Sequence, residues 1–130
     1  MPISSTLPYA SVTTPGVVTG GTVFKNNEPS GTAIDLASGA GRIWYFEVDN
    51  TANTSYSFLK LYDAAAASVT VGTTVPLVIW RCDPGVVTSV MVIKGGAFST
   101  ALSGVVVTAG GTGGTTAPSN YAPMKVITGT

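Results

Sequence analysis

Residues 43–49 of this chain read Ile-Trp-Tyr-Phe-Glu-Val-Asp, and this stretch decides the fold class. Its even positions, Trp44, Phe46 and Val48, are all apolar, whereas its odd positions end in two carboxylates. A period of two is typical of a β-strand that turns one face to a core and the other to water. We therefore expect a half-buried strand whose three even side chains lie in the core.

Similar runs rich in Val, Ile, Thr and aromatic residues recur at a spacing of about ten residues, with Gly, Pro, Asn or Asp between them. They predict strands over residues 17–25, 32–37, 42–49, 56–63, 75–82, 86–94, 97–99, 104–109 and 125–128. The one helix-like run, the four alanines at 64–67, passes at once into β-branched residues. Eight or nine short strands without intervening helices favour antiparallel pairing. We therefore expect an all-β fold, either an antiparallel β-sandwich or a jelly-roll-like barrel.

Two strands carry a further expectation about register and burial. In residues 56–61 the apolar positions change from even to odd between Phe58 and Leu59, which predicts a β-bulge there. In residues 75–82 the side chains of Val78, Trp80 and Cys82 share one face. We expect Cys82 to be a small buried hydrophobic residue on that face.

The 130 residues include six basic and six acidic side chains, so the net charge is zero. Only 9% of residues are charged, against about 25% in ordinary soluble domains, while 45% are hydrophobic, enough for one buried core. The basic residues form no cluster, so nucleic acid is not an expected partner. Residues 1–6 lack the regions of a secretory signal, and Gly, Pro, Ser and Thr interrupt every long uncharged stretch, so we expect no membrane span.

The order of the chain predicts three parts. Residues 1–24 carry no charge and contain three prolines, which favours an extended, poorly self-packed segment. We expect an N-terminal arm over residues 1–16, a β-sandwich domain over 17–109, and a Gly-rich linker with the final strand over 110–130.

Candidate catalytic and metal-binding groups are few because the chain has no histidine and one cysteine. Triads, His bases and the common zinc sites are therefore excluded. Glu47 and Asp49 point the same way on a strand at about 7 Å, within the range of glycosidase acid pairs, but two acids on a solvent face are ordinary. Asp35, Asp63 and Asp83 lie near turns without a calcium-loop pattern, so capping explains them better. We expect no enzyme activity, no cofactor and no metal.

Five aromatic residues have two readings. Trp44, Tyr45, Tyr56, Tyr62 and Trp80 would stack on sugar rings if several of them lined one open surface. Aromatic residues at a period of two more often belong to a core or a subunit interface, and we favour that interpretation.

Four motifs occur in one order: FLKLYD at 58–63, VGTTVP at 71–76, GAFSTALS at 96–103 and TTAP at 115–118. In this order they resemble a group of small β-sandwich structural proteins of tailed bacteriophages, in which an LKLYD strand, a VGT-x-x-P turn, an aromatic-Ser-x-x-Leu-Ser segment and a TTAP linker recur. The similarity covers about residues 40–128. It departs from the group in the Gly-rich linker, where the group tends to be acidic, and residues 1–24 lie outside it.

The resemblance implies a building block of a phage particle and carries no active site, since the group has no known catalytic residue set. Buried interfaces are depleted in charge, so the neutral arm favours a capsid decoration, or cement, protein. Such a protein is made in the host cytoplasm, binds the major capsid protein across capsomers on the capsid surface and self-associates, preferably as a trimer. The alternative is a tail or fibre-associated module that binds host-surface glycan.

Low charge also predicts which residues touch other subunits, because the uncharged stretches are the arm and residues 95–124. The candidate interface residues are Pro2, Ile3, Leu7, Pro8, Tyr9, Val12, Pro15, Val17, Tyr121, Pro123 and Met124.

Overall fold

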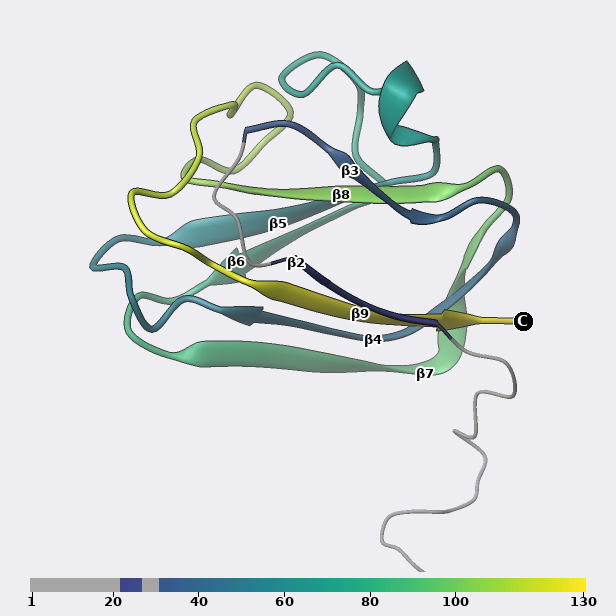
Figure 1. The fold of residues 1–130 in the computed structure, drawn as a ribbon, viewed down its shortest axis with the longest axis horizontal. Helices are drawn as coiled ribbons and strands as arrows, with labels where there is room; N and C mark the ends of the chain where they lie inside the picture. The colour runs from purple at the N-terminus through teal and green to yellow at the C-terminus, as the bar shows by residue number, and fades with distance from the viewer. Residues whose placement is uncertain (1–21, 27–30) are drawn as a thin grey trace, which may run out of the picture.

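The fold, seen in a computed structural model that describes residues 22–26 and 31–130, consists of two four-stranded antiparallel sheets packed face to face (Figure 1). One sheet has the strand order β2-β9-β4-β7 and the other β3-β8-β5-β6. The strands are β2 (Thr22–Asn26), β3 (Ile34–Ala37), β4 (Gly41–Asp49), β5 (Ser57–Tyr62), β6 (Val78–Cys82), β7 (Val87–Phe98), β8 (Leu102–Val107) and β9 (Met124–Gly129). The expected all-β antiparallel sandwich is confirmed. The expected arm at 1–16 lies outside the described residues.

The core lies between the two sheets. Leu59 and Leu61 of β5 and Val106 of β8 belong to the same buried cluster as Met124 and Val126 of β9. In β9 buried and half-buried side chains alternate along the strand, which is the pattern of a strand with one face in the core. Because β9 pairs with both β2 and β4, the last strand of the chain is an interior strand of its sheet.

The bulge that changes the burial phase lies in β4, not in β5. Opposite β9, Ile43 faces Thr128 and Tyr45 faces Ile127, so Trp44 is the extra residue. Ile43 is buried before the bulge, whereas Phe46 and Val48 are buried after it. The expectation that Trp44 shares their core face is therefore wrong, and its side chain is only half-buried.

In β5 the expected bulge between Phe58 and Leu59 is wrong, because the strand pairs without a register shift with both β6 and β8. The apolar side chains change position because both faces of this strand are covered. Leu59 and Leu61 belong to the core, while Tyr62 packs in a second cluster with Val105 and Val107.

The cover of that second face comes from two loops. Residues 63–77, which include the short 3₁₀ helix η2 (Ala66–Ser68), and residues 108–118 lie over β5 and β8 (Figure 1). Val69 and Val71 from the first loop pack against the second cluster. In the second loop Thr108 donates its backbone N–H to the carbonyl of Thr116 at 2.8 Å.

Residues 86–94 and 97–99 form one strand, β7, instead of two. Lys94 (φ 68°) and Gly95 (φ 73°) both lie in the left-handed region, which allows the chain to bulge and then resume pairing. Ile43 faces Gly96 and Tyr45 faces Met91, so four residues of β7 oppose one of β4. The two glycines that were expected to end the strand therefore only interrupt its ladder.

The Gly-rich segment 110–114 is a packed cover and not the expected linker. Beneath it, the Lys60 side chain is fully buried, and its Nζ donates to the carbonyl oxygens of Thr112 (3.3 Å) and Gly114 (2.8 Å). A Cβ at Gly114 would collide with the backbone of Ala109, so glycine is required at this close approach. Burial lowers the pKa of the Lys60 ammonium, while the two carbonyls partly replace its lost water.

We expect Lys60→Ala to destabilise the fold by about 2–4 kcal/mol, because it removes two charge-assisted hydrogen bonds and the packing of the side-chain stem. Urea denaturation followed by tryptophan fluorescence measures this change. Lys94→Ala is the matched control, because the Lys94 side chain is exposed, and it should change stability by less than about 0.5 kcal/mol. Equal effects of the two substitutions would show that the Lys60 contacts do not stabilise the loop.

Candidate functional site

The exposed large apolar side chains of the described residues concentrate in and around two consecutive strands, β6 and β7. Of the ten such side chains, eight lie between residues 75 and 93. We call these eight the β6–β7 surface, although they face different directions: Ile79 lies opposite Lys60 on the outer side of one sheet, whereas Met91 and Ile93 lie on the outer side of the other. The eight are Val75, Leu77, Ile79, Trp80, Val86, Val87, Met91 and Ile93.

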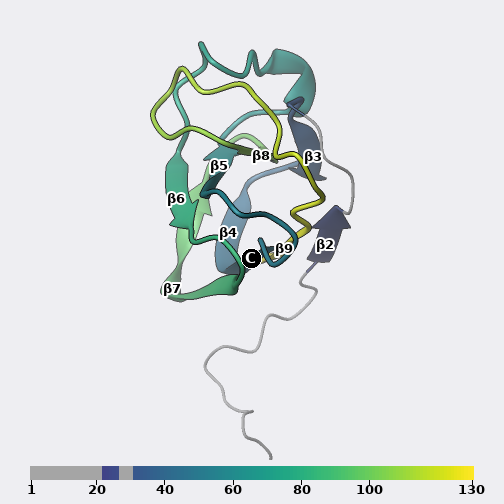
Figure 2. The same ribbon diagram turned by 90° about the vertical axis from the view of Figure 1, so that its left-hand side faces the viewer.

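β6 and β7 do not pair with each other; they are edge strands of different sheets on the same side of the sandwich (Figure 2). Trp80 bridges the two layers, because its ring meets that of Phe46 edge-on with centroids 5.7 Å apart. Trp80 shares the inward face of Val78 and Cys82, and it was expected in the core or an interface, yet it remains 41% exposed. At the open edge of a sandwich an inward-facing side chain is covered on one side only, which explains the difference.

On β7 the exposure is greatest at Met91 (76%) and Ile93 (84%). No charged residue occurs from Val86 to Ile93, and within the described residues β7 pairs with β4 alone. Native proteins usually protect an edge strand with charge, proline or a bulge, because its free backbone groups can pair with another chain. Clustered exposed apolar side chains are typical of an interaction surface.

The carboxylate pair considered for catalysis serves the structure. Glu47 Oε1 accepts a hydrogen bond from the Tyr45 hydroxyl at 2.6 Å and lies 3.8 Å from Lys125 Nζ. Asp49 Oδ1 accepts from the backbone N–H of Thr51 at 3.0 Å and from its hydroxyl. Each carboxylate has its own partners, and the pocket described below contains neither.

The acids considered for calcium have protein partners, and for Asp35 and Asp63 these are backbone N–H groups of distant segments and not those of their own turns. Asp35 accepts the backbone N–H of Ala66 at 2.7 Å and so holds η2 against β3. Asp63 accepts three successive N–H groups, of residues 99–101, and these hydrogen bonds lower the pKa of its carboxyl. Asp83 lies 3.3 Å from Arg81 in an exposed ion pair. Within the described part of the chain, no three metal-binding side chains gather.

The aromatic residues do not share one open surface. Tyr62 is fully buried, and Tyr45 is half-buried on another sheet. Tyr56 is exposed, but the Arg81 guanidinium lies 4.7 Å from its ring centroid and covers one face. The aromatic side chains therefore provide no row of stacking platforms for a glycan chain.

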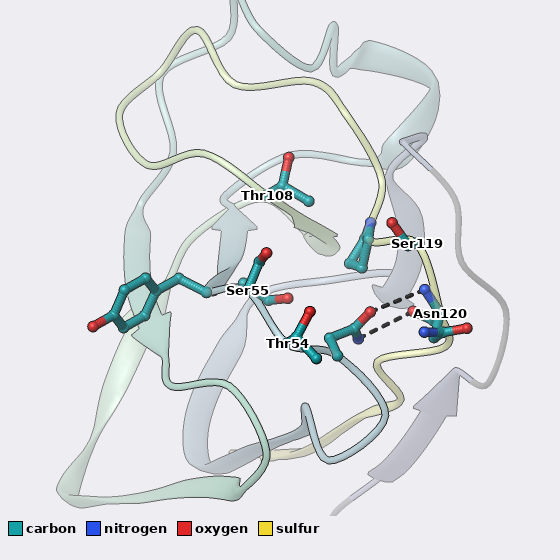
Figure 3. Close-up of a pocket in the computed structure, with 9 residues that line it drawn as sticks. Thr54, Ser55, Thr108, Ser119 and Asn120 are labelled. Atoms are coloured by element: carbon teal, nitrogen blue, oxygen red, sulfur yellow. Dashed lines mark hydrogen bonds between the residues drawn. The ribbon is translucent and has the colours of Figure 1, made fainter.

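A polar pocket of about 250 Å³ lies where the loop before β5 meets the loop before β9 (Figure 3). Asn53 fixes its floor, because its Oδ1 accepts the Asn120 N–H at 2.9 Å and its Nδ2 donates to the Asn120 carbonyl at 3.2 Å. No charged side chain lines the pocket. The lining residues are Asn53, Thr54, Ser55, Tyr56, Ser57, Thr108, Pro118, Ser119 and Asn120.

Of the candidate interface residues, those from Pro2 to Val17 lie outside the described residues. Tyr121 is exposed and Pro123 is half-buried, but Met124 is only 1% exposed and belongs to the core, so its assignment to an interface is wrong. Much of the uncharged stretch 95–124 is likewise buried within the chain's own fold. A lack of charge therefore accompanies burial in the chain's own core as well as burial in an interface. The β6–β7 surface was not found from the sequence, because it lies in the part of the chain that contains most of the charged residues.

Comparison with known proteins gave no match to a family model, to a curated protein or to a solved structure. In the part of the chain that the structure describes, no helix has the length and apolarity needed to cross a bilayer.

Cys82 is buried as expected, with 1% of its surface exposed. Loss of hydration raises the pKa of its thiol to about 11. We expect the native protein to resist a thiol reagent at pH 8 and to react within seconds once unfolded in guanidinium. Rapid labelling of the native protein would contradict the burial of this side chain.

The same shift predicts a loss of stability in alkali. Because the folded thiol keeps its proton up to pH about 11 while the unfolded thiol ionises near 9, its contribution is complete below pH 9 and falls as pH rises to 11. The difference is about 2–3 kcal/mol. Denaturation at several pH values should show this extra slope in the wild type relative to Cys82→Ala, and parallel curves would contradict it.

Proposed function

We propose that this chain is a non-enzymatic structural protein of a bacteriophage particle, specifically a capsid decoration protein that binds across major capsid proteins and stabilises the shell. The observation that carries the proposal is the β6–β7 surface, on which eight large apolar side chains stand exposed. A monomer in solution gains nothing from such a surface, whereas a subunit that buries it in an assembly gains binding free energy.

Two further observations support an assembly protein. The low charge of the chain suits a subunit that is surrounded by neighbours, since charged residues are depleted at the centre of interfaces. The acids that could have formed an active site are engaged in turns and in the β4 strand. The four motifs, which occur in the same order as in small β-sandwich proteins of tailed phages, support a phage particle as the assembly to which this chain belongs.

The mechanism is mechanical. A subunit that contacts two or more capsomers binds the assembled shell but not the separated proteins, so each bound copy favours the assembled state. Simultaneous contacts by an oligomer add avidity without a strong individual contact. A trimer at threefold positions of the shell fits this requirement.

We expect Leu77→Lys with Val86→Lys to weaken binding to purified shells that lack this protein by at least tenfold, because it charges the β6–β7 surface outside the strands. Co-sedimentation of the protein with the shells measures binding. Ser38→Lys is the matched control, because Ser38 is exposed next to β3, at the opposite edge of the sandwich. Equal binding by all three proteins, or density for this chain only in the tail of a reconstructed particle, would reject the proposal.

The polar pocket favours a second candidate, a tail or fibre-associated module that binds host-surface glycan. Hydroxyl and amide groups line it without a charge, which suits a neutral sugar of one or two rings. Tyr56 at its wall is the one aromatic residue positioned to touch such a ligand.

For this second candidate we expect Ser119→Trp to abolish binding to a neutral glycan on an array, because the indole would fill the pocket. Ser38→Trp, which places the same side chain at a distant exposed position, should leave the binding unchanged. An array on which the wild-type protein binds no glycan would remove this candidate.

A further inference from the structure

Within the described residues, the outer edge of β7 is unpaired along about five positions that pair regularly with β4. From Val87 to Ile93 the strand contains neither charge nor proline; its pairing with β4 is regular from Val87 to Met91, and the bulge takes up residues 92–95. Met91 and Ile93 project their side chains into solvent beside this edge. An added strand would pair with the free backbone groups and cover the two apolar side chains.

The same sequence contains a segment that matches this edge in its lack of charge. Residues 1–21 precede β2, lie outside the described residues, and carry no charge. Ile3 and Leu7 fall on one face of an extended chain, because they are four residues apart. Residues 9–14 contain no proline, so each can donate a backbone hydrogen bond to a neighbouring strand.

The position of β2 favours a segment from another molecule. β2 and β7 are the two opposite edges of one sheet, with β9 and β4 between them. Thr22 therefore lies three strand spacings from the β7 edge, about 14 Å, and its own N-terminal segment would have to go round two strands and turn back. A segment from a second copy meets no such obstacle.

We propose that the β7 edge binds residues 3–14 of a second copy of this chain as an added β-strand. The contact is heterologous, since the segment of one copy meets the strand of the next, and such contacts close into a ring when the rotation permits. The inference rests on the self-association within the proposed function and identifies how it occurs. Because neither partner is charged, salt does not weaken the contact.

The full chain provides the first test. Met91→Lys with Ile93→Lys should convert the wild-type oligomer into a monomer in light scattering coupled to gel filtration. Val75→Lys is the matched control, because Val75 is exposed to the same 76% as Met91 but lies outside β7, and it should stay oligomeric. A monomeric wild type, or equal loss of the oligomer in both variants, overturns the proposal.

The second test does not depend on the folding of the lysine variant. A labelled peptide of residues 1–16 is added to protein that lacks those residues, which keeps every core residue described above. The peptide should bind and slow amide hydrogen exchange in residues 87–93, and 1 M salt should not weaken it. A peptide with Val12→Pro, which loses one backbone donor, should bind at least tenfold more weakly. No binding, or equal binding by both peptides, overturns the proposal.

Shell binding separates this inference from the proposed function. If the truncated protein is monomeric yet still sediments with shells, then decoration stands and the avidity of the oligomer is lost. If the full-length protein forms an oligomer through β7 but does not co-sediment with shells, then the strand exchange stands and the decoration proposal fails.

Discussion

The burial of β5 on both faces is the constraint on which the rest of the structure depends. Leu59 and Leu61 fill the space between the sheets, whereas Lys60 and Tyr62 lie under loops on the opposite face. A strand that is buried on both faces needs material on each side. The chain therefore folds its two longest described loops, 63–77 and 108–118, over this one sheet.

Because both long loops lie over β5 and β8, the side of the sandwich that carries the edge strands β6 and β7 has no such cover within the described residues. The loops that cover β5 and β8 leave the outer edges of β6 and β7 open, and large apolar side chains remain exposed on these two strands and in the segments beside β6. Two carboxylates hold the covering loop in place. Asp35 of β3 accepts a hydrogen bond from Ala66 of η2, and Asp63, at the start of the loop, accepts one from Ser99 in the turn after β7. One side of the molecule is thus covered by its own loops, and the other side leaves large apolar side chains exposed.

The low charge has two physical causes in this fold. Along residues 101–107 it reflects burial in the chain's own core, where a charge without partners is costly. Along 86–93 it occurs on an exposed strand, where charge is usually favoured as protection against pairing. Only the second case indicates a partner, and the two cases look alike until the side chains are placed.

Period-two patterns and turn residues were sufficient to predict an all-β antiparallel sandwich, the location of most strands and the burial of Cys82, because these follow from local alternation. The phase of that alternation was less predictable. At Trp44 a bulge moves the inward face from odd to even positions, and at Phe58 a change in apolar positions reflects two covered faces instead of a bulge. The sequence of residues 58–62 alone does not distinguish a β-bulge from a strand that is buried on both faces.

The sequence by itself determined the strand content and the exclusion of histidine chemistry, since these depend on residue type and near neighbours. Only the tertiary structure decided that the glycines at 110–114 cover Lys60, that Met124 is core, and that β6 and β7 are the open edges. Which strand lies at an edge depends on pairing between residues far apart in the chain. For that reason exposure, and with it the candidate interaction surface, could not be inferred from composition.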